Sequence, residues 1–219
     1  MRPIHLLSSA AVLALATPLV VAEPVVLQVD HSQSFVVART GVEGALRTLG
    51  HEHGILATAW SADITFDAEN AAATRVQVSV PVRELRIDTP DALQRAGLTK
   101  GPSEKDVRKL QDTMVNRFLE ASEHPTITFR TTEVVVEGPE QVVLVGPLTL
   151  HGHTQTVRIP ARVQSIADGG VQVEGSFTIR QTDYGIQPES ILGVVRVSDP
   201  VRIRFSVTAR PTSVKAEAG

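Results

Sequence analysis

The chain has 219 residues, of which 42% are hydrophobic, enough for one well-buried core but short for two full domains. Charged residues make up 21% and the formal net charge is −3, so the excess of basic residues that nucleic-acid binding requires is missing. The absence of cysteine excludes disulfide bonds, a thiolate nucleophile and thiolate metal sites.

The N-terminal segment has the pattern of a cleavable signal peptide. Arg2 precedes an apolar stretch from Leu6 to Val21, and Val20-Val21-Ala22 supplies side chains of the size that signal peptidase accepts. Polar residues and Pro18 interrupt this stretch, which favours cleavage over a retained membrane anchor, and no later stretch could cross a bilayer. We expect a periplasmic or secreted protein with a signal peptide (1–22), one domain (23–211) and a flexible tail (212–219).

Alternation of apolar and polar side chains predicts half-buried β-strands along most of the chain. The alternation is clearest from Val171 to Ile179, and it recurs from Trp60 to Phe66, from Val76 to Val82 and from Val201 to Val207. Further strand-like runs, separated by turn residues, are Val25–Asp30, Ser34–Arg39, Thr126–Val136, Gln141–Leu150 and Thr154–Gln164. About eight long strands with one apolar face favour an all-β fold, a single antiparallel barrel without exposed edges.

One segment, from Ser103 to about Ala121, follows a helical period instead. Its apolar residues fall on one stripe, and Ser103 followed three residues later by Asp106 is typical of a helix start. An amphipathic helix between strands of a barrel would cover one open end as a lid or pack on the outside. The sequence leaves both positions open.

Four segments, taken in order, resemble the YceI-like family. They are the segments His124-Pro125-Thr126-Ile127-Thr128-Phe129-Arg130-Thr131-Thr132, Gly146-Pro147-Leu148-Thr149-Leu150-His151-Gly152, Phe177-Thr178-Ile179-Arg180-Gln181-Thr182-Asp183-Tyr184-Gly185-Ile186 and Val197-Ser198-Asp199-Pro200-Val201. The resemblance covers nearly the whole mature chain. It implies a periplasmic or secreted protein with a lipocalin-like barrel that encloses a polyisoprenoid or a related long-chain amphiphile.

A lipid-binding barrel needs apolar side chains on its inner face, because each buried methylene contributes about 0.8 kcal/mol. An isoprenoid quinone or a polyprenyl lipid would suit such a cavity. The alternative is a barrel filled by its own side chains, which would serve as a structural or interaction module. The aromatic residues that we expect to line the cavity are Phe35, Trp60, Phe66, Phe118, Phe129, Phe177 and Phe205.

Histidine pairs support a second hypothesis, a site for zinc, copper or nickel, with hydrolysis as a conceivable activity. His51 and His53, and again His151 and His153, are two residues apart, which places both imidazoles of each pair on one face of a strand. Parity assigns His51 and His53 to the face opposite Trp60, unless a bulge near Gly54 resets it. The alternative is that these histidines bond backbone groups and line a polar barrel mouth.

No catalytic motif is present. The chain has neither a Gly-x-Ser-x-Gly elbow nor a glycine-rich phosphate loop, and residue 55 is isoleucine where a helical zinc-protease motif would need histidine. We therefore expect a binding protein and not an enzyme. Its oligomeric state, a homodimer included, stays open.

Overall fold

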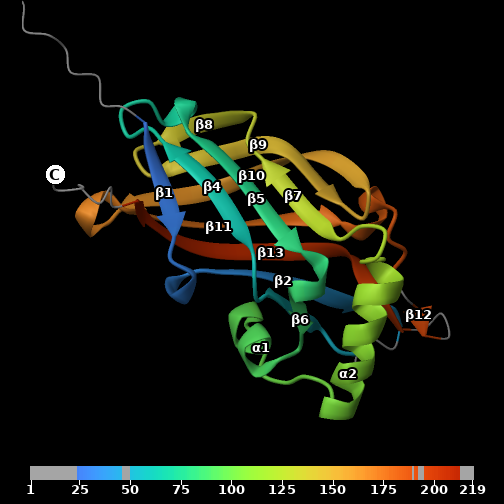
Figure 1. Cartoon of the computed structure of the whole chain (residues 1–219). Coiled ribbons are helices and arrows are strands. Elements are labelled where there is room, and N and C mark those ends of the chain that lie inside the picture. Colours follow the sequence, from blue (N-terminus) through green and yellow to red (C-terminus); the bar gives the residue numbers. More distant parts are fainter. Residues whose placement is uncertain (1–23, 46–49, 189, 192–194, 213–219) are drawn as a thin grey trace, which may run out of the picture.

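The computed structural model is built mainly of antiparallel strands and describes residues 24–45, 50–188, 190–191 and 195–212 (Figure 1). Apolar side chains at every second position give most strands one inward and one outward face. The strands are β1 (Val25–Val29), β2 (Phe35–Glu43), β3 (His53–Ala57), β4 (Ser61–Phe66), β5 (Arg75–Pro81), β6 (Leu85–Ile87), β7 (Thr126–Arg130), β8 (Glu133–Gly138), β9 (Gln141–Leu150), β10 (His153–Ser165), β11 (Val171–Arg180), β12 (Ser190–Ile191) and β13 (Val195–Pro211).

The sheet closes into a barrel of eight strands in the order β1-β4-β5-β7-β9-β10-β11-β13. Closure depends on β1, which pairs with β4 on one side and with the end of β13 on the other, where Val29 lies opposite Ala209. Before it reaches β1, the 17-residue strand β13 pairs with β2, which is followed in the sheet by β3 and β6. The sheet contains the neighbours β1-β4-β5 and, in the same order, β2-β3-β6. The consecutive strands β1 and β2, β4 and β3, and β5 and β6 therefore each act as one bent strand.

Two helices lie between β6 and β7, at one end of the barrel (Figure 1). They are α1 (Pro90–Ala96) and α2 (Glu104–Thr113), and a π-helical turn (Met114–Phe118) continues α2. The Ser103 side chain accepts a hydrogen bond from the Asp106 backbone N–H, as the sequence predicts for a helix start. Short 3₁₀ turns occupy His31–Gln33, Ala71–Ala73, Val82–Glu84, Ala167–Gly169 and Gln181–Tyr184.

The structure confirms an all-β antiparallel barrel of eight strands with one amphipathic helix between strands. That helix ends at Phe118, a little before the predicted end, because a π-helical turn closes it. The short strands β3, β6 and β12 and the helix α1 were not predicted from the sequence, and the predicted strand Thr126–Val136 is divided into β7 and β8. A signal for α1 was present, since Thr89 caps it, Pro90 opens it and Gly97 ends it in the left-handed conformation.

The expected signal peptide (1–22) lies outside the described residues, as do residues 213–219 of the expected tail. Within the described ranges, no helix has the length and apolar character that crossing a bilayer demands.

A side chain of α2 covers the edge of the sheet at β6. In the described part of the chain, β6 has a strand partner on one side, β3. On the other side the Gln111 Oε1 accepts a hydrogen bond from the Ile87 N–H (3.0 Å), and its Nε2 donates to the Leu85 carbonyl (2.8 Å). Gln111 thus takes the place of a partner strand and attaches the helix to the barrel.

Replacing Gln111 by leucine should lower the free energy of unfolding by about 1–3 kcal/mol, because it leaves a backbone N–H and a carbonyl of β6 without partners. Urea denaturation measures this change. The matched control is Lys109→Leu on the exposed part of the same helix, expected within about 0.5 kcal/mol of the parent protein. Equal stabilities of the two variants would contradict the assigned role of Gln111.

Candidate functional site

The barrel is hollow and encloses a cavity of ≈ 360 Å³, a size within the range of small-molecule pockets. Among the described residues, the lining is aliphatic and aromatic except for the polar side chains of Thr40, His53, Gln181 and Gln187. The structural-module alternative required a barrel filled by its own side chains, and the barrel interior is not filled in this way.

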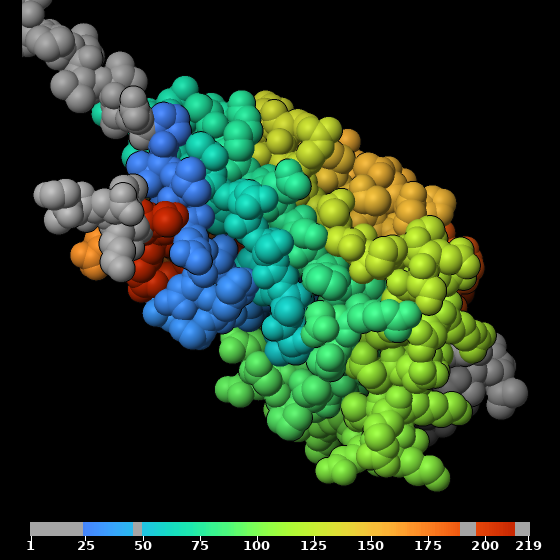
Figure 2. Space-filling view, in the orientation of Figure 1, coloured from blue at the N-terminus to red at the C-terminus, as the bar shows by residue number. Residues whose placement is uncertain are grey.

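The helical segment forms one end of the cavity. Leu110, Met114 and Phe118 all line it, and their spacing of four residues places them on one face of the helix. Leu119 extends this apolar surface. In Figure 2 the green and lime residues of the helical segment form a continuous cover over the lower end of the molecule. Of the two positions left open by the sequence, the helix takes that of a lid.

The cavity wall includes five of the seven aromatic residues named from the sequence. Three of them lie on strands of the barrel, one directly precedes β4 and one lies on the π-helical turn that follows α2; the five are Phe129, Phe177, Phe205, Trp60 and Phe118. Trp60 also contacts the ring of His31, with 4.9 Å between the ring centroids. These five side chains give the cavity large flat surfaces against which an apolar chain can pack.

The other two aromatic residues lie outside the cavity. In β2 the even-numbered residues Val36, Ala38 and Thr40 face inward, so Phe35 faces outward, where the guanidinium groups of Arg95 and Arg204 lie over its ring. Phe66 has the inward parity of β4 but stands at the end of that strand, packed against a small cluster with Leu27, Ile64, Val171 and Ala209. The prediction that Phe35 and Phe66 line the cavity is therefore wrong, because Phe35 has the outward parity of β2 and Phe66 lies at the end of β4.

The inward face changes parity between β3 and β4. The inward residues are odd-numbered in β3 (His53, Ile55 and Ala57) and even-numbered from Trp60, directly before β4, through β4 (Ala62 and Ile64). Thr58 and Ala59 form the bend, where the Thr58 N–H donates to the Glu84 carbonyl (2.9 Å). The reset thus occurs at this bend and not at Gly54, and it brings His53 onto the same face as Trp60.

The polar side chains of the cavity wall interrupt its apolar lining near Thr40 and His53. Thr40 and His53 are directly opposite each other on β2 and β3, and Val201 of β13 lies opposite Thr40 on the other side. The Thr40 hydroxyl is buried and makes no hydrogen bond within the described residues. Gln187 lines the cavity and is itself exposed, which marks this as the end where the lining reaches the surface.

Asp88 holds the ring of His53. Its Oδ2 lies 2.6 Å from His53 Nδ1 and its Oδ1 accepts from the Gly54 N–H (2.9 Å), while the Asp88 side chain is fully buried. A carboxylate only accepts hydrogen bonds, so this contact assigns a proton to Nδ1 and leaves Nε2 to the cavity. Gly54 is needed here because a Cβ would lie 2.7 Å from the Ala92 carbonyl of α1.

The four histidines proposed as metal ligands do not form one group. His51 is exposed, and His53 is engaged by Asp88. His151 stacks on His153 with 6.2 Å between the ring centroids, and His124 approaches His151 more closely, at 4.8 Å. Glu120 and His124 were not among the predicted ligands, since nothing in their spacing relates them to a histidine in a distant turn.

Thr40 is the hydroxyl residue on the cavity wall, yet in the described structure its Oγ1 makes no hydrogen bond to His53 or to any other group. A hydroxyl nucleophile needs a base within hydrogen-bond reach. What these residues offer is an apolar cavity with hydrogen-bonding groups at one end.

A closed antiparallel barrel with an apolar cavity and a helical lid belongs to the lipocalin-like class of β-barrels. The family model described as "YceI-like domain" matches residues 26–209, nearly the whole described chain. The protein therefore belongs to the YceI-like family, as the four sequence segments indicated.

Curated relatives match over a shorter stretch. The chain is 33% identical over 128 residues to a UPF0312 protein of Pseudomonas aeruginosa and 32% identical over 130 residues to one of Vibrio cholerae. The two alignments cover 56% and 57% of this chain. They cover 58% and 60% of those relatives, which is less than two thirds of their length.

Solved structures share the fold at low sequence identity. Burkholderia cenocepacia BcnA superposes with a TM-score of 0.63 at 19% identity, covering 82% of this chain and 98% of BcnA. A polyisoprenoid binding domain from Saccharophagus degradans gives 0.56 at 13% identity, covering 86% of this chain and 99% of that domain. Campylobacter jejuni YceI gives 0.53 at 18% identity, covering 73% and 85% of the two chains.

The rim beside the cavity contains a buried tyrosine without a hydrogen-bond partner. Tyr184 is 1% exposed, and its hydroxyl makes no hydrogen bond within the described residues. Burial raises the pKa of Tyr184 to about 12, and the neighbouring Asp183 carboxylate adds to this effect. The folded protein therefore keeps the phenolic proton at pH values where the unfolded chain releases it.

Tyr184→Phe should stabilise the protein at pH 7 by up to about 1 kcal/mol, since it removes a buried hydroxyl without a partner. The raised pKa adds a pH dependence: stability contributed by the protonated tyrosine is complete below pH 10 and is lost as the pH rises through 12. Between pH 9 and 11 the parent should lose about 1 kcal/mol more than the variant in urea denaturation. Parallel stability curves would contradict the raised pKa.

Proposed function

We propose that the protein binds a long-chain amphiphile, and specifically an isoprenoid, in the barrel cavity. The observation that carries the proposal is the cavity itself, with apolar walls and polar side chains gathered at one end. The structural neighbour from Saccharophagus degradans, described as a polyisoprenoid binding domain, supports the choice of an isoprenoid. Membership of the YceI-like family agrees with it.

Burial of hydrocarbon alone supplies enough affinity. At about 0.8 kcal/mol for each buried methylene-sized group, two five-carbon prenyl units contribute about 8 kcal/mol before the costs of ordering. Aliphatic and aromatic walls contact such a chain without needing polar recognition along its length. The hydrogen-bonding groups then determine which end of the molecule lies at the mouth.

The head group of the ligand should be small and able to form hydrogen bonds. The unpartnered hydroxyl of Thr40 and the Nε2 atom of His53 lie on neighbouring strands at the cavity wall. A quinone carbonyl or a prenyl alcohol would satisfy the Thr40 hydroxyl, which otherwise stays buried without a partner. An isoprenoid quinone or a polyprenyl lipid fits both features, the apolar wall and the polar end.

We further propose that the protein acts as a carrier and not as an enzyme. Support comes from Thr40, which has no base within hydrogen-bonding contact in the described structure. Sequestration of an oily molecule from water needs a closed cavity and no reacting group.

The signal-like residues at the N-terminus support export to the periplasm or beyond, where a carrier could move lipid across an aqueous space. Expression of the full chain in a Gram-negative host should place mature protein outside the cytoplasm, with a mass that corresponds to a chain beginning at Glu23. Intact-mass analysis of the periplasmic fraction measures this. Recovery of the full-length mass in the cytoplasm alone would contradict export.

The single tryptophan reports on the cavity directly, because Trp60 is part of its wall. Titration with a dispersed isoprenoid quinone should quench its emission to saturation, and native mass spectrometry should show a one-to-one complex. Ala62→Phe should weaken binding at least about tenfold, because a phenyl group would occupy space at the cavity wall. Ala72→Phe, at an exposed position, is the matched control and should bind as the parent does.

Thr40→Val tests the polar end in the same titration. It keeps the shape of the side chain and removes the hydroxyl, so binding of a polyprenyl alcohol should weaken about 3- to 10-fold. Uptake of a hydrocarbon of similar length without a head group should stay unchanged. If the parent protein takes up neither the polyprenyl alcohol nor the hydrocarbon, or if the Ala62→Phe variant binds as well as the parent, the proposal of an isoprenoid-binding cavity is overturned.

A further inference from the structure

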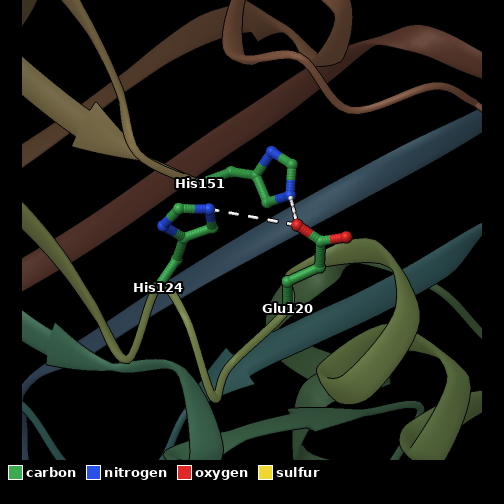
Figure 3. Close-up of side chains that lie close together, drawn as sticks. All are labelled: Glu120, His124 and His151. Atoms are coloured by element: carbon green, nitrogen blue, oxygen red, sulfur yellow. Dashed lines mark hydrogen bonds and ion pairs between the residues drawn. The ribbon is translucent and has the colours of Figure 1, made fainter.

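A separate cluster of potential ligands lies outside the cavity, where the helical lid meets the barrel rim. Glu120 follows the π-helical turn, His124 precedes β7, and His151 lies in the turn between β9 and β10 (Figure 3). One nitrogen or oxygen atom from each residue lies within 4.8 Å of the other two. Glu120 and His151 directly follow Leu119 and Leu150, which line the cavity.

The ring of His151 stands between two oxygen atoms. Its Nδ1 lies 3.0 Å from the Tyr184 carbonyl and its Nε2 lies 2.9 Å from Glu120 Oε2. A carbonyl and a carboxylate both accept hydrogen bonds, whereas a neutral imidazole has one N–H to donate. If that proton is on Nδ1, the lone pair of Nε2 faces the carboxylate, and a positive ion bound by both atoms would remove the repulsion between them.

The arrangement matches what metal ligation by histidine requires. A ligating imidazole commonly donates its other N–H to a carbonyl, as His151 can to Tyr184. His124 Nε2 lies 3.9 Å from Glu120 Oε2, and neighbouring ligand atoms around a tetrahedral zinc ion are about 3.4 Å apart. Small rotations of the three side chains would bring all three atoms to one ion.

The backbone around the cluster holds these side chains in place. Glu120 and His151 both have positive φ values, 44° and 51°, in the left-handed region that residues other than glycine rarely adopt. Gly152 leaves space for the neighbouring imidazole, since a Cβ at this position would lie 2.7 Å from His124 Cε1. Such strained positions are common where a fold holds a functional group.

We propose that Glu120, His124 and His151 bind one divalent transition-metal ion, with Zn²⁺ as the best match. Two imidazoles and one carboxylate form an established zinc ligand set, and the half-exposed Glu120 leaves room for a water molecule as fourth ligand. The ion would connect the helical lid to the turn between β9 and β10. The site is distinct from the lipid cavity, so it stands or falls independently of the proposed lipid.

The test is isothermal titration of the tag-free, chelator-treated protein with Zn²⁺ alone, without lipid. One equivalent should bind, and Co²⁺ at the same site should give the visible absorption of a low-symmetry, four-coordinate ion. His124→Gln and Glu120→Gln should each weaken Zn²⁺ binding by about 100-fold or more, because each removes a ligand. Circular dichroism establishes that each variant is folded.

His51→Gln is the matched control, since His51 is exposed and lies outside the cluster. It should bind Zn²⁺ as the parent does and show the same rise in Tm when the ion is added. Absence of stoichiometric binding to the parent protein would overturn the proposal. So would binding that persists in His124→Gln and Glu120→Gln, or that is lost in His51→Gln.

Discussion

Closure of the sheet by the pairing of β1 with the end of β13 is the constraint on which the structure depends. A closed ring directs every second side chain to the interior, and eight strands leave space that these side chains do not fill. The inner surface then lines a cavity instead of a filled core. The apolar cavity is thus a result of strand number and alternation, to which no single residue is essential.

The helical insertion between β6 and β7 forms the part of the cavity wall that the strands do not supply. Among the described residues β6 has no strand partner beyond β3, and at that end α2 with its π-helical turn supplies Leu110, Met114 and Phe118 to the cavity wall. Gln111 attaches the same helix to the backbone of β6. One short segment therefore protects a sheet edge and closes the cavity, and its far end carries Glu120 to the barrel rim.

Local pattern was enough to predict much of the fold. The predicted strand Gln141–Leu150 coincides with β9, and Ser103 caps the helix as its sequence suggested. What escaped prediction depends on tertiary structure. The two-residue bend after β3 reverses the inward parity, so His53 was predicted on the wrong face of its strand. Glu120 and His124 approach His151 only because the lid folds back onto the rim. Spacing along the chain contains no information about either arrangement.

A ring of ladder hydrogen bonds cannot widen locally without breaking several of them, so the wall offers a guest molecule no exit of its own. A guest therefore leaves through an end of the barrel, and the lid that lies at one end is attached to β6 through the two hydrogen bonds of one glutamine side chain. The residence time of a guest should then follow the strength of a few contacts at the lid and vary little with the length of its hydrocarbon tail. In this architecture the affinity for a guest and the rate at which the guest dissociates can change independently.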